Sequence, residues 1–268
     1  MSVQVERRFV AVPDGTVHCA VAGRGPAVLL LHQTPRSWDE YRDVLPLLGR
    51  RRLAIAMDTV GFGDSPALPP GEDSIERWAA VAADVLDAMG LERAAVVGHH
   101  TGAYVAAELA AARPERVEAV VLSSLNLSTP EERLAAATGR AVVDDVDARS
   151  DGGHVLELWR GRAAFYPPST DLLERYLVDC LRAGERASEG HRVVARYAVE
   201  ERLPLLRCPA LLVAASDDPH AYPCLPALRA ALPNARVAEI EGGTVALPDG
   251  RPEEFAAAVE AFLDELVP

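Results

Sequence analysis

The segment Gly98-His99-His100-Thr101-Gly102 has the residue types and spacing to place a reactive side chain at the end of a strand. It follows the apolar run 94–97 and precedes an alanine-rich, strongly helical segment that continues to residue 113. Glycines two positions before and two after a central residue allow a tight turn, so the central side chain projects from the carboxyl edge of a sheet. That central residue is His100, whose imidazole is suited to general acid–base chemistry near neutral pH.

This strand, turn and helix resemble the nucleophile elbow of the α/β-hydrolase superfamily, Gly-x-nucleophile-x-Gly, whose central residue is most often Ser and sometimes Asp or Cys. Here histidine takes that position. The family usually carries a second motif after its eighth strand, Gly-x-Gly-His or Gly-Gly-His, whereas this chain has Gly242-Gly243-Thr244. The resemblance therefore implies the fold, while a serine-hydrolase relay would lack both its serine and its base.

The family's catalytic acid follows the seventh strand, and the resemblance implies Asp218, in preference to Asp217, for this position. An imidazole at position 100 is longer than a serine side chain, so we expect His100 to reach Asp218 directly. The carboxylate would then fix the tautomer and raise the basicity of the ring. The second ring nitrogen would act as a general base or acid, and nucleophilic attack by the ring is a third option.

The loop after the third strand reads His32-Gln33-Thr34-Pro35. By resemblance to family members with His-Gly or His-Gln here, the backbone N–H groups of Gln33 and Thr101 form an oxyanion hole. Such donors favour a substrate with a carbonyl group. Further candidates for contacts with the substrate are His32, Trp159, Tyr166, His191, His220 and Thr244. Asp58, in a turn common after the fourth strand of the family, is expected to have a structural role.

Apolar runs separated by helical segments predict a mostly parallel, doubly wound, eight-stranded α/β sheet. The expected strands are 4–12, 16–22, 27–31, 53–57, 94–97, 116–123, 210–215 and 236–240. The main expected helices are 37–48, 74–89 and 252–266. A charged, helical stretch after the sixth strand predicts a core domain of residues 1–125 and 201–268 with a helical cap at 126–200.

With 268 residues, 49% of them hydrophobic, the chain is long enough to bury one sizeable core. Its formal charge of −13 argues against nucleic-acid or anionic-membrane partners, and a neutral or cationic small molecule is the expected ligand. The charged start and the lack of an apolar run of about 18 residues predict a cytoplasmic protein, expected as a monomer or homodimer.

No cofactor or metal is expected. The four scattered cysteines indicate neither a disulfide framework nor a zinc ribbon. No carboxylate stands at helical ligand spacing from His32, His99 or His100.

These residues support three hypotheses. The leading one is hydrolysis of an ester, lactone or similar bond in a largely apolar, carbonyl-containing small molecule by activated water. The second is a non-hydrolytic lyase, cyclase or isomerase step in secondary metabolism, because an acid–base dyad also serves proton transfer without water. The third is a binding protein that has kept the pocket and lost the chemistry.

Overall fold

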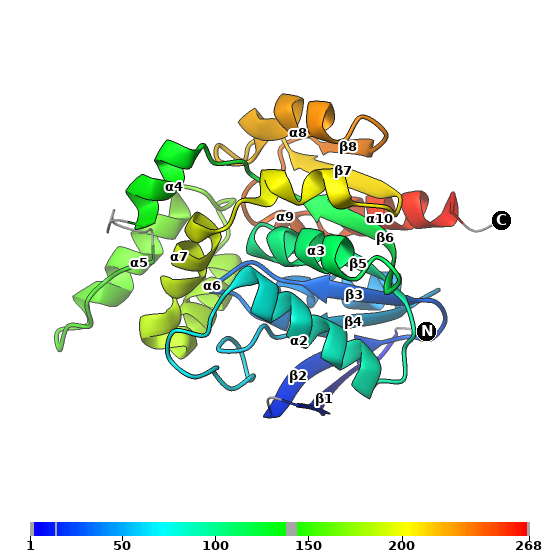
Figure 1. Ribbon diagram of the computed structural model, residues 1–268. Helices are drawn as coiled ribbons and strands as arrows, with labels where there is room; N and C mark the ends of the chain where they lie inside the picture. Colours follow the sequence, from blue (N-terminus) through cyan, green and yellow to red (C-terminus); the bar gives the residue numbers. More distant parts are fainter. Residues whose placement is uncertain (1–2, 14, 138–143, 267–268) are drawn as a thin grey trace.

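An eight-stranded sheet organises the computed structural model, which describes residues 3–13, 15–137 and 144–266 (Figure 1). The strands lie in the order β1-β2-β4-β3-β5-β6-β7-β8. Their bounds are β1 Val5–Val12, β2 Gly15–Ala22, β3 Ala27–Leu31, β4 Leu53–Met57, β5 Ala94–His99, β6 Val117–Ser123, β7 Ala210–Ala215 and β8 Arg236–Ile240. The predicted α/β fold with a mostly parallel sheet is confirmed.

The strand pairing follows from the sequence pattern. β1 and β2 form an antiparallel hairpin, β2 pairs antiparallel with β4, and the strands from β3 to β8 pair in parallel. β3, β5 and β7 are buried at every residue, which is why β3, β7 and residues 94–97 of β5 appear in the sequence as unbroken apolar runs. Since side chains alternate between the two faces, Leu29 and Leu31 join one core and Val28 and Leu30 the other.

Helices cover both faces of the sheet (Figure 1). One core contains residues of α2, α3 and α8, and the other contains residues of α1, α9 and α10. The bounds outside the segment between β6 and β7 are α1 Leu45–Leu48, α2 Ile75–Ala88, α3 Thr101–Ala112, α8 Leu225–Ala231, α9 Leu247–Gly250 and α10 Pro252–Asp264. Short 3-10 turns within and outside that segment are η1 Trp38–Tyr41, η2 Gly184–Arg186, η3 Val199–Glu201, η4 Leu203–Leu205 and η5 Tyr222–Cys224.

The expected helix 37–48 is wrong as a continuous element. The chain forms η1, then a turn, and then the short helix α1. Pro46 lacks an N–H group and disfavours helical backbone in the residue before it, so a long helix cannot run through this point. Asp39 and Glu40, which would be exposed on such a helix, are instead buried.

The chain between β6 and β7, residues 124–209, carries a group of helices that we call the inserted segment. Its helices are α4 Pro130–Ala137, α5 Gly153–Ala163, α6 Thr170–Ala183 and α7 Glu189–Arg196. They lie at the left of Figure 1, beyond the arrowheads of the parallel strands. The division into a core domain and a cap remains a prediction, and residues 138–143 of the predicted cap lie outside the described part of the chain.

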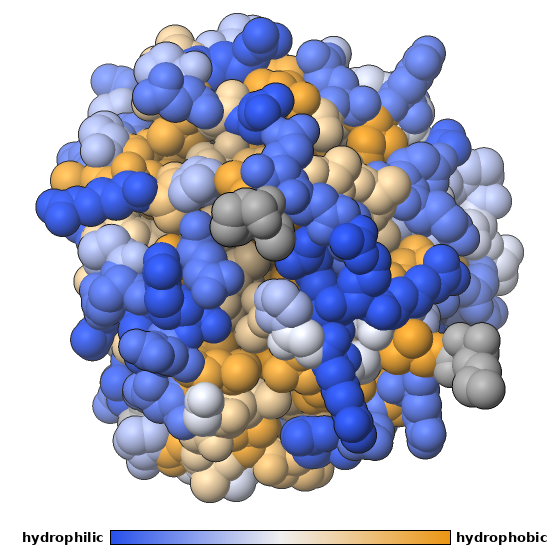
Figure 2. All heavy atoms as spheres, turned by 90° about the vertical axis from the view of Figure 1, so that its right-hand side faces the viewer, coloured by the Kyte–Doolittle hydropathy of each residue, from blue (hydrophilic) through white to orange (hydrophobic). Residues whose placement is uncertain are grey.

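The side of the molecule on the right of Figure 1, away from the inserted segment, is shown in Figure 2. Hydrophilic side chains cover much of this face, and smaller apolar areas lie between them. Among the described residues, no helix has the length and apolar character needed to cross a membrane.

Candidate functional site

His100 occupies a sharp turn between β5 and α3, with φ 45° and ψ −114°. Positive φ is unfavourable for most residues with a side chain. The flanking glycines are needed here: a Cβ atom on Gly98 would lie 2.1 Å from the Gly102 carbonyl oxygen, and one on Gly102 would lie 1.9 Å from the Leu31 carbonyl oxygen. The close approach of strand and helix therefore requires both glycines, and it presents His100 at the carboxyl edge of the sheet.

His100 lies against Asp218, which follows the end of β7. The His100 Nε2 atom is 2.8 Å from Asp218 Oδ2, and the Asp218 side chain is completely buried. The ring N–H is not well aligned with this oxygen, so the contact is a close approach of the two atoms and not a linear hydrogen bond. The other oxygen, Oδ1, accepts hydrogen bonds from the backbone N–H groups of His220, at 3.0 Å, and Ala221, at 3.1 Å.

These contacts determine the charge of Asp218. Burial alone would raise the pKa of its carboxyl group. The positive charge of protonated His100 and the N–H groups of Ala221 and His220 outweigh burial and hold the pKa well below its usual range. The carboxylate is therefore ionised at neutral pH and stabilises a proton on His100 Nε2.

His99 supports the turn from behind. Its buried ring has Nε2 at 2.9 Å from the Val245 carbonyl oxygen and Nδ1 at 2.9 Å from Ser123 Oγ. A carbonyl oxygen only accepts, so Nε2 carries the proton. Burial, with a further contribution from neighbouring His100, lowers the pKa of His99 to about 3. His99 is thus a neutral ring, packed edge-on against His100 with 4.8 Å between ring centroids.

A cavity of about 230 Å³ opens in front of His100. Five of the predicted site residues line it: Gln33, His100, Thr101, His191 and His220. Asp218 does not line it, because it lies behind the His100 ring. The remaining lining residues are Thr34, Tyr104, Asn126, Arg162, Phe165, Val194 and Val245.

The geometry does not fit the expected oxyanion role of Gln33. Its backbone N–H donates to Glu40 Oε2 at 2.9 Å. Its side-chain amide donates to Glu40 Oε1 at 2.6 Å and to the Val245 carbonyl oxygen at 3.3 Å. Both donors of Gln33 are therefore occupied inside the protein. Thr34, the next residue, also lines the cavity, and its hydroxyl lies 3.0 Å from the hydroxyl of Thr101.

Two other residues predicted to contact the substrate, His32 and Thr244, form hydrogen bonds with the protein backbone instead. His32 donates from Nδ1 to the Gln33 carbonyl oxygen at 2.7 Å, and its Nε2 accepts from the Thr59 N–H at 2.9 Å. Thr244 accepts from the Ala246 N–H at 3.3 Å through its hydroxyl. Neither side chain lines the cavity, and the substrate contacts expected of both remain predictions.

Two predicted aromatic contacts also lie elsewhere. Tyr166 is buried, where its hydroxyl accepts from Arg36 at 3.5 Å and its ring packs edge-on against Tyr176. Trp159 packs against the hydrophobic core. Neither lines the cavity, because helix packing uses both rings.

The sequence carried a signal for some of the cavity residues that the prediction missed. Thr34 stands beside Gln33 in the loop after β3, and Asn126 follows β6, so both lie where strand ends meet. Arg162 carried no such signal, because an arginine in a charged helix is ordinarily exposed. Its burial depends on Asp144, which is distant in the sequence and accepts from its Nη2 atom at 2.6 Å.

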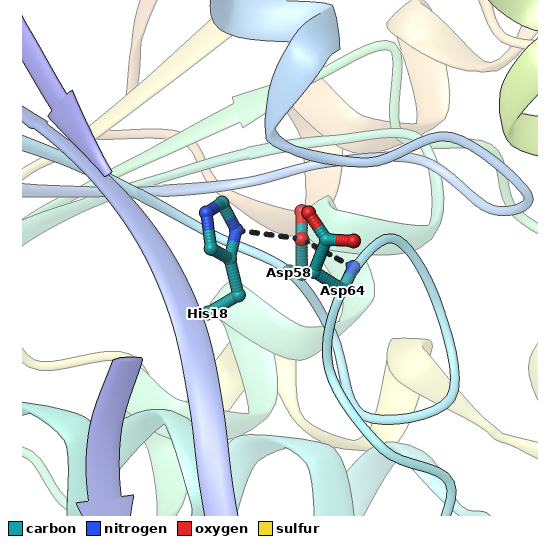
Figure 3. Close-up of side chains that lie close together, drawn as sticks. All are labelled: His18, Asp58 and Asp64. Atoms are coloured by element: carbon teal, nitrogen blue, oxygen red, sulfur yellow. Dashed lines mark hydrogen bonds and ion pairs between the residues drawn. The ribbon is translucent and has the colours of Figure 1, made fainter. Parts of the chain in front are cut away.

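A separate cluster of His18, Asp58 and Asp64 has three potential ligand atoms within 4.8 Å of one another (Figure 3). His18 donates from Nδ1 to Asp58 Oδ2 at 2.8 Å, and its Nε2 accepts from Arg7 at 2.9 Å. Asp64 pairs with Arg7 and, at 2.9 Å, with Arg182. A metal ion would have to displace these partners and lie beside two arginines, so we assign no metal to the cluster.

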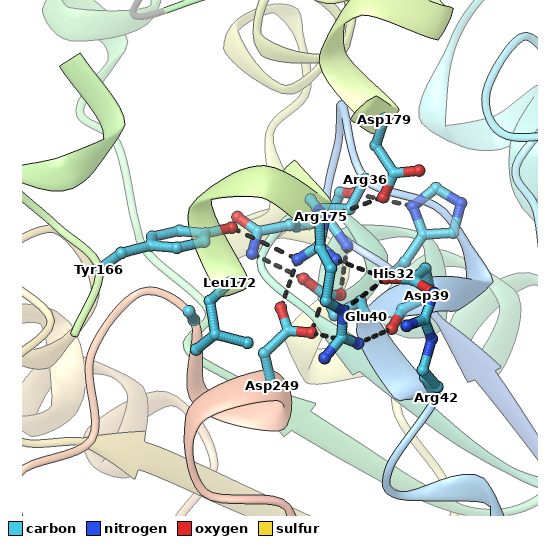
Figure 4. A network of polar contacts seen from close by, with 12 residues as sticks. His32, Arg36, Asp39, Glu40, Arg42, Tyr166, Leu172, Arg175, Asp179 and Asp249 are labelled. Carbon is cyan, nitrogen blue, oxygen red and sulfur yellow. Dashed lines mark hydrogen bonds and ion pairs between the residues drawn. The ribbon is translucent and has the colours of Figure 1, made fainter. Parts of the chain in front are cut away.

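A buried ionic network joins the loop after β3 to α6 and α9 (Figure 4). Arg36 contacts Asp179 at 2.9 Å, Asp39 at 3.4 Å and also Asp249. Arg175 of α6 bonds Asp39 at 2.7 Å and Asp249 at 3.0 Å. The network holds the loop that carries Gln33 and Thr34 against the inserted segment.

The sheet order, the elbow at His100 and the helices around them are those of an α/β-hydrolase fold. The family model described as alpha/beta hydrolase fold matches residues 26–147, which include the elbow and the loop after β3 but not Asp218.

Curated relatives match part of this chain. One is an epoxide hydrolase 2 from Siraitia grosvenorii, 32% identical over 145 residues, which are 53% of this chain and 46% of the relative. Another is a fluoroacetate dehalogenase from a Burkholderia species, 34% identical over 116 residues, which are 42% of this chain and 38% of the relative. The matches thus span less than half the length of these relatives.

Solved structures resemble the chain over nearly its whole length. An enol-lactonase from Burkholderia xenovorans has a TM-score of 0.80 at 20% identity, covering 96% of this chain and 100% of that one. An epoxide hydrolase from Vigna radiata has a TM-score of 0.79 at 18% identity, covering 97% and 98%. Likeness at this identity establishes the fold alone.

Proposed function

We propose that this chain hydrolyses an ester, lactone or similar bond in a small molecule, with His100 as general base and Asp218 as its positioning partner. One observation carries the proposal. It is the 2.8 Å contact between His100 Nε2 and the buried Asp218 carboxylate, at a cavity that His100 lines.

The contact leaves His100 Nδ1 for chemistry. With the proton on Nε2, Nδ1 is the basic nitrogen, and among the described residues no hydrogen-bond partner meets it. A water molecule at Nδ1 would attack the substrate carbonyl carbon and give its proton to Nδ1. The same proton would then pass to the departing oxygen as the acyl bond breaks. Such catalysis contributes about 10² to 10⁴ in rate.

We propose the backbone N–H groups of Thr34 and Thr101 as the donors to the developing oxyanion. Both residues line the cavity, and within the described ranges neither N–H has an acceptor. Thr101 begins α3, so the positive end of the helix dipole adds to this stabilisation. This pair replaces the expected pair of Gln33 and Thr101.

The curated relatives support a hydrolytic reaction. The matched part of the chain contains the elbow, and the relatives named above are an epoxide hydrolase and a dehalogenase. We therefore add epoxides to the candidate substrates, because a base at the elbow can also direct water at a strained ring carbon.

The test measures turnover of 4-nitrophenyl esters, small lactones and epoxides in H₂¹⁸O. We expect the product to contain one solvent oxygen, and His100→Gln to lower kcat/KM by about 10² to 10⁴. The matched control is His154→Gln, a histidine of the inserted segment that does not line the cavity and accepts from the Arg149 N–H at 3.1 Å.

Conversion without ¹⁸O in the product would overturn hydrolysis in favour of a lyase, cyclase or isomerase. Ligand binding unaffected by His100→Gln, with no turnover of any class, would favour a binding protein.

A further inference from the structure

The inserted segment places a second polar cluster on the cavity wall. Arg162 of α5 and His191 of α7 both line the cavity. Both bond the same oxygen of Asp144, which lies behind them: Arg162 Nη2 is 2.6 Å and His191 Nε2 is 2.8 Å from Oδ2. The hydroxyl of Tyr176 donates to the other oxygen of Asp144.

Arg162 has donors left over. Its side chain is 6% exposed, and its guanidinium carbon lies 4.4 Å from the centre of the Tyr176 ring. Its Nη2 atom donates to Asp144, the Tyr176 hydroxyl also interacts with the guanidinium, and within the described ranges Nε is buried without a partner. Leaving a buried charged donor unpaired is costly, and a ligand that supplies an acceptor would remove the cost.

The charges around Asp144 are also unbalanced. Burial would raise the pKa of Asp144, but Arg162 and His191 hold it well below the usual range, so the group stays ionised. The single negative charge of Asp144 is therefore shared between Arg162 and His191, which both bond its Oδ2 atom. Among the described residues that line the cavity there is no carboxylate, so Arg162 faces the cavity without an acidic neighbour on its surface.

A third histidine, His220, lines the same cavity. Burial lowers the pKa of its ring, Asp218 opposes this shift, and His100, Arg162 and His191 add to it. The Arg162 guanidinium therefore lies close enough to the opposite wall to influence a ring there. Phe165, Val194 and Val245 supply apolar surface in the same cavity.

We propose that Arg162 and His191 bind a carboxylate of the substrate, whose reacting carbonyl group lies at His100. The substrate class is then a small acid that carries an ester, lactone or similar bond at a distance from its carboxylate. This inference rests on the proposed function for the reacting group, but not for the binding of the carboxylate. The net charge of −13 opposes non-specific attraction of anions, so a preference for an anion would come from this local site.

The test compares two probes of equal length, the dicarboxylate glutarate and its neutral diamide glutaramide, by titration calorimetry. We expect the wild-type protein to bind glutarate at least about tenfold more tightly, as charge-assisted hydrogen bonds imply. Arg162→Gln and His191→Gln should each remove most of this preference. Arg160→Gln, which changes an exposed arginine of the same helix, should keep it.

Equal binding of both probes to the wild-type protein, or an unchanged preference in a folded Arg162→Gln protein, would overturn the proposal. Should Arg162→Gln fail to fold, His191→Gln decides, because its side chain is 31% exposed and less important for packing.

The outcomes also separate this proposal from the proposed function. A preference for glutarate without turnover of any ester would keep the carboxylate site and overturn the hydrolase. Turnover of neutral and acidic esters with equal kcat/KM, and no preference for glutarate, would overturn the carboxylate site and keep the hydrolase.

Discussion

Gln33, at the wall of the cavity, donates twice to the buried Glu40: its backbone N–H bonds Oε2 at 2.9 Å and its side-chain amide bonds Oε1 at 2.6 Å. Glu40 is completely buried, and burial raises its pKa from 4.5 to about 8. Arg36 opposes this shift and Asp249 adds to it. A group that holds the loop of the site therefore titrates close to neutral pH.

The first prediction concerns stability. Between about pH 4.5 and 8 folded Glu40 retains a proton that the unfolded chain releases, so its contribution to stability is lost as pH rises through this range. We expect Glu40→Gln, which cannot ionise, to reduce the fall in Tm between about pH 4.5 and 8. Asp179 and Asp249, whose pKa values burial also raises, should leave part of the fall in place.

Differential scanning calorimetry measures this fall. Glu157→Gln serves as the control, because the Glu157 side chain is 53% exposed. An identical pH dependence of Tm in the wild-type and Glu40→Gln proteins would show that Glu40 is ionised in the fold.

The second prediction concerns Asp218. Asp218→Asn keeps the shape and an oxygen for the N–H groups of His220 and Ala221, but it removes the charge that positions His100. We expect kcat to fall by about 10² to 10⁴ with little change in Tm. The lowered pKa of Asp218 means that the wild-type pH–rate profile should show no ionisation of this group between about pH 5 and 9. Wild-type activity in Asp218→Asn would exclude the dyad.

The third prediction replaces the elbow residue with the one usual in the family. By its resemblance to α/β-hydrolases the chain is expected to have Thr244 at the position of their histidine, and His99 donates to the Val245 carbonyl oxygen, so His100→Ser introduces a hydroxyl without a base. We expect no burst of 4-nitrophenol and a kcat/KM at least about 10² below wild type. A burst would point to another base. The double variant with His220→Gln then tests the remaining imidazole nearest Asp218.

The fourth prediction concerns the buried network. Arg36→Met leaves Asp179 and Asp249 buried without their main cationic partner, so we expect the free energy of unfolding to fall by about 3 to 5 kcal/mol. Arg160→Gln, at an exposed site, should change it by less than about 0.5 kcal/mol. Urea unfolding measures both, and equal values would contradict the structural role of Arg36.

The elements that could be predicted are those in which local sequence and burial agree. The runs 27–31, 53–57, 210–215 and 236–240 have the same bounds in the structure as in the prediction, because apolar runs between turn residues match strands buried in a sheet. His100 and Asp218 could be expected to meet, since the carboxyl ends of parallel strands share one edge.

The polar partners across elements could not be predicted in this way. From the sequence, Gln33 is expected to donate to an oxyanion. In the structure its backbone N–H donates to Glu40 instead. This contact forms because the chain folds back at η1 and does not continue as a helix. Arg162 likewise becomes a cavity residue only through Asp144. Neither pair follows a helical or strand periodicity, so the sequence pattern carries no signal for them.

The loop after β8 contacts the site through a main-chain atom, the Val245 carbonyl oxygen. This oxygen accepts from His99 at 2.9 Å and from Gln33 at 3.3 Å, while the neighbouring Thr244 side chain reaches only the Ala246 N–H. In a two-residue dyad the loop after β8 has no proton to carry, and it serves as a scaffold through its backbone. The Thr244 side chain is therefore open to redesign, whereas the backbone path of the loop is not.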